Sequence, residues 1–307
     1  MKKYDVIIIG AGPGGMTSAL YASRANLSVL MLDRGIYGGQ MNNTAAVENY
    51  TGFRSILGPD LAKAMYKSSV HFGAKYGYGS VQQIEVRGKS RIVKTDNGTY
   101  EAPVVIIATG SQNRKLGVPG EKQYSGKGVS YCAVCDGNFF KDQKVIVVGG
   151  GDSAVSEGIY LSQLASQVVI VHRRDQLRAE KILQDRAFKN PRIKFIWNTN
   201  VTKIDGNGMK VTGVETLNNR THQTGHLTAA GIFIYIGNVP MTDQFSSLKI
   251  TNEQGWIETN DQMETRIPGV FAIGDVRDKK LRQIATAVGD GGVAGQNAFD
   301  YLQSLKD

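Results

Sequence analysis

The sequence predicts an α/β protein built from two similar units, the second inserted in the first. A strand, a glycine-rich turn and a helix follow one another twice, from residue 6 and again from residue 145. Such internal repetition indicates two copies of one plan. A further strand-like segment, residues 267–275, follows the second copy and is best placed as a returning part of the first unit.

The first copy is a β-α-β unit that ends at Asp33. Gly10 permits a tight turn, Gly12 lets the backbone approach a pyrophosphate, and Gly15 allows close packing of helix on strand. The helix N-terminus supplies partial positive charge. Asp33 lies 23 residues after Gly10, near the distance at which an acidic side chain accepts hydrogen bonds from an adenosine ribose. Strand, glycines, helix, strand and acid in this order predict a dinucleotide site.

The second copy repeats this plan but replaces the acid with basic residues. Its turn begins at Gly149, and His172 lies 23 residues further on, the offset of Asp33 in the first copy. Arg173, Arg174 and Arg178 follow, and guanidinium groups at this position pair with a 2′-phosphate. The second site is therefore expected to prefer NADPH to NADH. A solvated basic turn is the alternative.

Each copy continues with strand-rich sequence and a closing strand, residues 104–110 and 231–237. The Asn-Gly pairs at 97–98 and 207–208 predict hairpins. We expect two Rossmann-like domains with three ββα layers: residues 1–113 with 241–307 form the first, and residues 114–240 form the second. The two crossings between them are expected to act as hinges.

Cys132 and Cys135 are the only cysteines in 307 residues, and they form a C-x-x-C motif between the two glycine-rich turns. Such a pair can close and reopen a disulfide. A zinc site is the weaker interpretation, because it needs two more ligands and none of the four histidines has a spacing that pairs with the cysteines. We expect a redox dithiol and no metal.

Composition excludes several other classes. The formal charge of +9, from 36 basic and 27 acidic residues, comes from scattered side chains without a nucleic-acid-binding motif, so no nucleic-acid partner is expected. No run of eighteen apolar residues and no signal peptide is present, so neither membrane spanning nor export is expected. A cysteine pair without a disulfide framework fits the reducing cytoplasm.

With these motifs, the chain resembles the low-molecular-weight thioredoxin reductases of bacteria over nearly all of its length. The resemblance rests on segments spread along the chain: the N-terminal fingerprint, Gly38-Gly39-Gln40, Glu48-Asn49-Tyr50, Ala108-Thr109-Gly110, Cys132 to Gly137, His172-Arg173-Arg174, and Gly274 to Asp278 with Arg282-Gln283.

The resemblance implies an NADPH-dependent FAD enzyme that reduces the disulfide of thioredoxin, and it implies a homodimer. FAD would lie in the first domain, held by Gly10, Gly12, Gly15, Asp33, Arg34, Gly35, Gly38, Gly39, Gln40, Asn49, Asp275, Val276, Arg282, Gln283 and Ile284. NADPH would lie in the second, held by Gly149, Gly151, Asp152, Ser153, Ala154, His172, Arg173, Arg174 and Arg178.

By the same resemblance, three residues carry the disulfide chemistry. Cys135 faces the flavin, Cys132 exchanges with the protein substrate, and Asp136 acts as acid or base. A turn or N-cap role is the alternative for Asp136. The Phe139-Phe140 pair is expected either to contact thioredoxin or to pack in the core. Asn138, where relatives carry a small or aromatic residue, bears on the choice of partner.

Two other functions remain open at this stage. The chain could reduce another small dithiol protein, or it could be a flavin-bound sensor that signals by its dithiol without turnover. The related reductase of peroxiredoxins carries an additional N-terminal domain with its own dithiol, and a ferredoxin reductase on this scaffold would not need the two cysteines.

Overall fold

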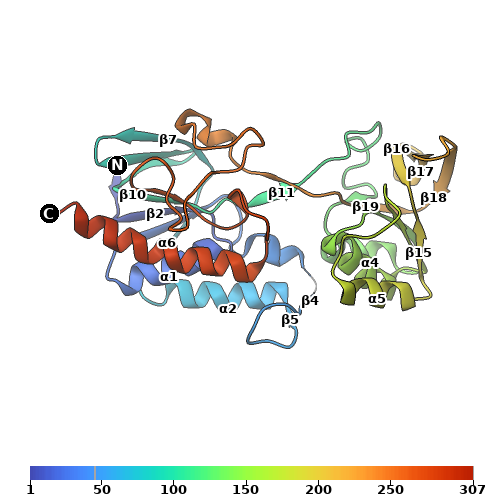
Figure 1. Ribbon diagram of the computed structural model, residues 1–307, viewed down its shortest axis with the longest axis horizontal. Helices are drawn as coiled ribbons and strands as arrows, with labels where there is room; N and C mark the ends of the chain where they lie inside the picture. The colour runs from blue at the N-terminus through green and yellow to red at the C-terminus, as the bar shows by residue number, and fades with distance from the viewer. Residues whose placement is uncertain (45, 307) are drawn as a thin grey trace. The chain divides into compact units, whose positions relative to one another are not determined.

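The computed structural model describes residues 1–44 and 46–306 and divides into two compact units (Figure 1). Unit 1 comprises Met1–Gln112 and Val239–Asp307, and unit 2 comprises Asn113–Asn238. Unit 2 is therefore inserted in unit 1. The chain passes between them at β11 (Ser111–Asn113) and β20 (Asn238–Pro240), which pair as a two-stranded sheet.

A parallel sheet of five strands forms the centre of unit 1. Its order is β21 (Val270–Ala272), β10 (Val104–Ile107), β2 (Val6–Ile9), β3 (Val29–Asp33) and β6 (Lys75–Tyr78). Successive side chains of a strand point to opposite faces, so a sheet covered on both faces needs continuous apolar strands. In β2, Val6 and Ile8 enter one core while Ile7 and Ile9 enter the other.

Helices cover one face of this sheet and an antiparallel sheet covers the other. The helices are α1 (Pro13–Arg24), α2 (Gly58–Val70) and α6 (Ile284–Ser304). The antiparallel layer has the order β1 (Lys2–Lys3), β9 (Gly98–Ala102), β8 (Ser90–Thr95) and β7 (Val81–Arg87), in which only the β1–β9 pair is parallel. Shorter elements are η1 (Gly39–Asn43), β4 (Ala46–Val47), β5 (Ile56–Leu57), η3 (Asp243–Leu248) and η4 (Gly274–Val276).

Unit 2 repeats the three layers. Its parallel sheet has the order β12 (Val129–Ser130), β19 (Gly231–Tyr235), β13 (Lys144–Gly149), β14 (Gln167–Val171) and β15 (Ile193–Ile196). Helices α4 (Asp152–Leu164) and α5 (Lys181–Lys189) cover one face, and β16 (Thr199–Gly206), β17 (Val211–Asn218) and β18 (Thr224–Thr228) cover the other. Helix α3 (Ala133–Asp136) and η2 (Gly137–Phe140) follow β12.

The predicted fold class is confirmed, and both Asn-Gly hairpins form, between β8 and β9 and between β16 and β17. The strand expected over residues 267–275 is shorter than predicted, because the strand that pairs with β10 spans Val270–Ala272. Gly269 and Gly274 have φ of +70° and +72°, left-handed conformations that end the strand on both sides. Among residues 1–44 and 46–306, no helix is long and apolar enough to cross a bilayer.

Candidate functional site

The predicted FAD residues of unit 1 gather beyond the carboxyl ends of the parallel strands. Gly10 follows β2, Asp33 ends β3, and Asp275 lies beyond β21. In open α/β sheets, ligands bind at this edge of the sheet.

The glycine turn after β2 has the shape that a pyrophosphate requires. Gly10 has φ of +107°, and a Cβ there would lie 2.3 Å from the carbonyl oxygen of Ala108. A Cβ on Gly15 would lie 2.0 Å from the carbonyl oxygen of Gly10, so close packing excludes a side chain at either position. A Cβ on Gly12 would meet nothing within 4 Å, and Gly12 caps α1 without any side-chain bond. The first N–H groups of α1 are thus open to an anion.

Asp33 is held where a ribose would need an acceptor. Its Oδ2 accepts the Ala11 N–H at 2.7 Å and its Oδ1 accepts the Gly35 N–H at 3.0 Å. Each carboxylate oxygen has a second lone pair for a sugar hydroxyl. Tyr76 braces this loop, because its hydroxyl donates to the Gly35 carbonyl oxygen. Burial, and then the charge of Asp33, raise the pKa of Tyr76 to about 12, so it remains a donor.

The segment after this loop returns to the glycine turn. The Gly38 N–H donates to the Ala11 carbonyl oxygen at 2.8 Å, and a Cβ on Gly39 would lie 3.5 Å from the Cα of Gly12. The Gln40 side chain donates to the Ser111 carbonyl oxygen at 3.1 Å. Residues 38–40 therefore pack against the first fingerprint, whereas Arg34 is exposed and reaches the Met241 sulfur at 3.6 Å.

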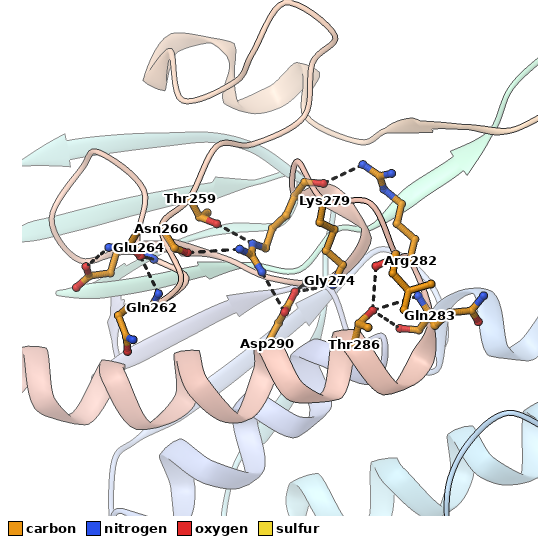
Figure 2. A network of polar contacts seen from close by, with 12 residues as sticks. Thr259, Asn260, Gln262, Glu264, Gly274, Lys279, Arg282, Gln283, Thr286 and Asp290 are labelled. Carbon is orange, nitrogen blue, oxygen red and sulfur yellow. Dashed lines mark hydrogen bonds and ion pairs between the residues drawn. The ribbon is translucent and has the colours of Figure 1, made fainter.

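The loop after β21 carries further predicted FAD residues, namely Asp275, Val276 and Arg282, and Figure 2 shows polar contacts of this loop. Arg282 donates to the carbonyl oxygens of Asp275 at 3.4 Å and Arg277 at 3.0 Å, and its guanidinium carbon lies 3.6 Å from the Trp256 ring centroid. Burial raises the pKa of the Asp275 carboxyl, and the charges of Lys279 and Arg282 oppose that shift. Val276 is fully buried in η4.

Two further predicted residues meet at the start of α6. The Asn49 amide donates to the Gln283 side-chain oxygen at 3.2 Å. Gln283 and Thr286 form a capping box for α6, which begins at Ile284. Both arrangements fix side chains at the edge where the first fingerprint lies. The predicted FAD residues thus fit a dinucleotide with its pyrophosphate on α1.

In unit 2 the second fingerprint lies at the corresponding edge. Gly149 ends β13 with φ of +146°, and a Cβ there would lie 2.2 Å from the Tyr235 carbonyl oxygen. Ala154 is fully buried in α4 and takes the packing role of the third glycine. Gly151 caps α4 without a side-chain bond, and a Cβ there would meet nothing within 4 Å. This geometry leaves space for an anion at α4, as Gly12 does at α1.

Asp152 and Ser153 open α4. The Asp152 Oδ1 accepts the Glu180 N–H at 2.7 Å, which ties the start of the helix to the segment after β14. Ser153 is exposed beside it.

His172 and the three arginines take different positions. The His172 side chain is 4% exposed, its ring lies where a Cβ on Gly150 would come within 2.5 Å, and burial lowers the pKa of its imidazole. The His172 ring therefore packs against the backbone of the glycine turn at Gly150. The Arg178 N–H donates to the Gly150 carbonyl oxygen at 2.7 Å. Arg173, Arg174 and Arg178 are exposed, and none has a carboxylate partner in the part of the chain that the structure describes. Unpaired guanidinium groups beside an open helix start fit a phosphate.

The disulfide joins Cys132 and Cys135, which have a Cα–Cα distance of 5.4 Å, and it follows β12 at the same edge of the unit 2 sheet. Cys132 precedes α3 and is half-buried, while Cys135 is exposed. The Cys135 N–H donates to the Cys132 sulfur at 3.1 Å. The Cys132 N–H donates to Ser130 Oγ at 3.0 Å. The backbone is therefore arranged to stabilise negative charge on the Cys132 sulfur.

Asp136 directly follows Cys135. Its side chain makes no capping bond to η2, so the structure gives no support to a capping role.

Behind the disulfide, the Ala133 N–H donates to the Tyr235 hydroxyl oxygen at 2.9 Å. Burial, and then the charges of Glu157 and Asp136, raise the pKa of Tyr235. Burial also raises the pKa of Glu157 to about 7, and its Oε2 has no hydrogen-bond partner among residues 1–44 and 46–306.

The phenylalanine pair splits between surface and core. Phe139 is 75% exposed, whereas Phe140 packs edge-on against Phe233 with ring centroids 5.5 Å apart. Phe139 lines a cavity of about 250 Å³ with Asp136 and Lys127. One residue of the pair is thus available to a partner and the other belongs to the core.

Comparison with known proteins agrees with this geometry. Residues 4–291 match the family model described as pyridine nucleotide-disulphide oxidoreductase. The chain belongs to the pyridine nucleotide-disulphide oxidoreductase family. A thioredoxin reductase of Listeria innocua is 56% identical over 306 residues, covering 100% of this chain and 96% of that protein. One of Bacillus subtilis is 54% identical, covering 100% and 97%.

A solved structure has the same fold. The thioredoxin reductase of Lactococcus lactis matches with a TM-score of 0.97 and 48% identity, covering 98% of this chain and 99% of that one. The resemblance inferred from the sequence motifs is confirmed, and the chain is an oxidoreductase enzyme of this family.

Several residues that shape these sites were not predicted from the sequence. Gly150 accommodates the His172 ring, Tyr235 holds the dithiol segment, and Asp290 with Lys279 holds the loop of Asp275. Tyr235 lies 102 residues from Ala133, so no local spacing could indicate that contact. Of these residues, only Gly150 is marked in the sequence, because it is the middle glycine of the second glycine-rich turn.

Proposed function

We propose that the chain is an NADPH-dependent flavoprotein that reduces the disulfide of thioredoxin through Cys132 and Cys135. The observation that carries the proposal is the position of this disulfide, beyond β12 at the sheet edge that also bears the second fingerprint. Membership in the pyridine nucleotide-disulphide oxidoreductase family supports it, as do relatives named thioredoxin reductase at 54–56% identity.

FAD is proposed for unit 1, with its pyrophosphate at Gly12 and the start of α1, its ribose at Asp33, and its ribityl hydroxyls near Asp275. The open space at Gly12 and the two lone pairs left on Asp33 support this placement. The segment of residues 38–40 and the cap of α6 at Gln283 would enclose the rest. NADPH is proposed for unit 2, with its pyrophosphate at Gly151 and its 2′-phosphate at Arg173, Arg174 and Arg178.

When bound, NADPH supplies a hydride and FAD passes two electrons on to a disulfide. The chain's own residues then carry out the disulfide exchange and the proton transfer. The reduced Cys132, as a thiolate stabilised by the Cys135 N–H, attacks one sulfur of the acceptor's disulfide. A mixed disulfide forms, the acceptor's own S–S bond breaks, and its other sulfur leaves as a thiolate. Cys135 attacks the Cys132 sulfur, which closes the Cys132–Cys135 bond again and releases the second sulfur of the acceptor. Asp136 gives and takes the proton at the exchanging sulfur.

We also propose a protein partner, an oligomeric state and a cellular setting. The exposed Phe139 offers an apolar contact to thioredoxin beside the dithiol. A homodimer rests on the resemblance, and the groove of about 830 Å³ in unit 1, lined by Tyr21, Phe53 and Met65 among others, is a surface that it would cover. The cytoplasm is proposed from cysteine usage.

The test is NADPH oxidation by the purified protein with thioredoxin from the same organism, against NADH and against a mixture without thioredoxin. Rapid turnover that needs both NADPH and thioredoxin is expected, and Cys135→Ser should abolish it. Undiminished turnover by Cys135→Ser would refute the disulfide route.

A second candidate, reduction of a different small dithiol protein, predicts that NADPH reduces the flavin while thioredoxin is not reduced. A redox sensor predicts a stable reduced dithiol and no turnover with any acceptor. The same assay, run with a panel of small dithiol proteins, separates the three functions.

A further inference from the structure

A buried cluster of three charged side chains joins α6 to the loop that carries Asp275 (Figure 2). Asp290, on α6, is 8% exposed. Its Oδ1 lies 3.0 Å from the Arg277 guanidinium, and its Oδ2 lies 2.8 Å from the Lys279 ammonium. The same Oδ2 accepts the Gly274 N–H at 2.9 Å. The Asp290 carboxylate thus makes polar contacts with three residues of the loop.

These three residues lie on both sides of Asp275. Gly274 precedes it, and Arg277 and Lys279 follow within four residues. Arg277 is fixed further by its bond to Thr259 Oγ1 at 2.7 Å and to the Asn260 carbonyl oxygen at 3.4 Å. Any displacement of the Asp275 backbone would therefore stretch at least one contact to Asp290.

The cluster also sets the electrostatic surroundings of Asp275. The cationic groups of Lys279 and Arg282 favour the ionised carboxyl, and the negative charge of Asp290 disfavours it. Burying an ion cluster is weak evidence for a stabilising role, because desolvation offsets the attraction. A role in fixing the position and charge of a neighbouring group explains the arrangement better.

We propose that Asp290 is a positioning residue of the flavin site: through Gly274, Arg277 and Lys279 it holds the Asp275 carboxylate where the flavin's ribityl hydroxyls can donate to it. The proposal rests on the proposed function, because it assumes that unit 1 binds FAD. Asp290 itself is not expected to touch FAD.

The first experiment measures the Kd of FAD for the full-length apoprotein, by quenching of flavin fluorescence. Asp290→Asn should raise the Kd at least about tenfold, a factor that corresponds to ~1.4 kcal/mol. Asp300→Asn is the matched control, since it removes the same charge from an exposed position of the same helix, and it should leave the Kd unchanged. An unchanged Kd in Asp290→Asn would overturn the positioning role.

The second experiment separates positioning of a charge from simple packing. FAD affinity should fall as pH drops through the pKa of Asp275, because a protonated carboxyl loses acceptor capacity. Asp290→Asn removes a negative neighbour, so the midpoint of this loss should move to lower pH. Lys279→Met removes a positive neighbour, so the midpoint should move to higher pH. Midpoints that shift in the same direction in both variants, or that do not shift, would contradict the proposal that Asp290 and Lys279 set the charge state of Asp275.

The Lys279→Met variant and the wild type keep the inference testable if Asp290→Asn does not fold or if FAD does not bind. Should Asp290→Asn not fold, Lys279→Met carries the measurement, because it keeps the Arg277–Asp290 pair and is still expected to weaken FAD binding and shift the midpoint upward. A wild-type chain that fails to bind FAD would refute the proposed function itself, whereas a wild type that binds FAD as tightly as both variants would refute only the inference.

Discussion

At the scale of single residues, the three exposed arginines after β14 should decide the choice of nicotinamide cofactor. Arg173→Ala and Arg174→Ala should each raise the KM for NADPH about tenfold, because a charge-assisted hydrogen bond contributes roughly 1.5–3 kcal/mol. The KM for NADH should stay the same, since NADH lacks the 2′-phosphate. Steady-state kinetics with both cofactors measure this.

Arg220→Ala is the control for these variants, because Arg220 is an exposed arginine of the same unit that is already paired with Asp175. If NADPH and NADH lost affinity equally in Arg173→Ala and Arg174→Ala, the arginines would contribute general attraction rather than recognition of the 2′-phosphate.

Glu157 should make the stability of unit 2 depend on pH. Burial raises the pKa of its carboxyl to about 7, above the value of about 4.3 expected in an unfolded chain. The folded state therefore retains the proton that the unfolded state loses. The retained proton stabilises the folded state. This stabilisation is fully present below the unfolded pKa and is lost as pH rises to 7, which lowers the free energy of unfolding by an amount on the order of 3 kcal/mol.

Glu157→Gln should remove that dependence: the variant should match the wild type at pH 4 and be the more stable protein at pH 8. Urea unfolding at both values measures the difference, with the exposed Glu180→Gln as control. A gap between Glu157→Gln and the wild type that is the same at both pH values would rule out titration of Glu157.

At the scale of elements, glycines set the contact between α1 and α6. A Cβ on Gly291 would lie 2.3 Å from the Gly14 carbonyl oxygen, so Gly291→Ala should destabilise the protein by about 1–3 kcal/mol through overpacking. Gly289 lies two residues earlier on the same helix, and a Cβ there would meet nothing within 4 Å. Gly289 lines the groove of unit 1, so in the isolated subunit, where this groove is uncovered, Gly289→Ala should stabilise the folded chain by up to ~1 kcal/mol through helix propensity. Opposite shifts in the chemical denaturation midpoint are expected, and shifts of the same sign would contradict this account.

The elements also show where sequence reasoning succeeds and where it stops. Strand, turn and helix of each fingerprint follow from local spacing, so the fold class and the Asn-Gly hairpins were predicted correctly. The contacts of Tyr235 and Asp290 join residues that are far apart in the chain, and only tertiary packing reveals them. His172 illustrates the same limit, because its place in the motif gave no sign that the ring lies buried under Gly150.

At the scale of the whole molecule, the two units should unfold separately. Among the described residues, two core clusters belong entirely to unit 1 and two entirely to unit 2. A ligand that binds only the folded form of one unit stabilises that unit alone, by ~2.7 kcal/mol at 100 times its Kd. Calorimetry should therefore show two transitions: removal of FAD should lower one, and NADP⁺ should raise the other by several degrees.

The double variant Arg173→Ala/Arg174→Ala identifies which transition belongs to which unit. It should lose the shift caused by NADP⁺ and keep the shift caused by FAD, because its substitutions lie only in unit 2. A single transition that both ligands move would mean that the two units unfold together despite their separate cores. In that case the paired segments β11 and β20 would have to transmit stability between the units, and substitutions there should lower both ligand responses at once.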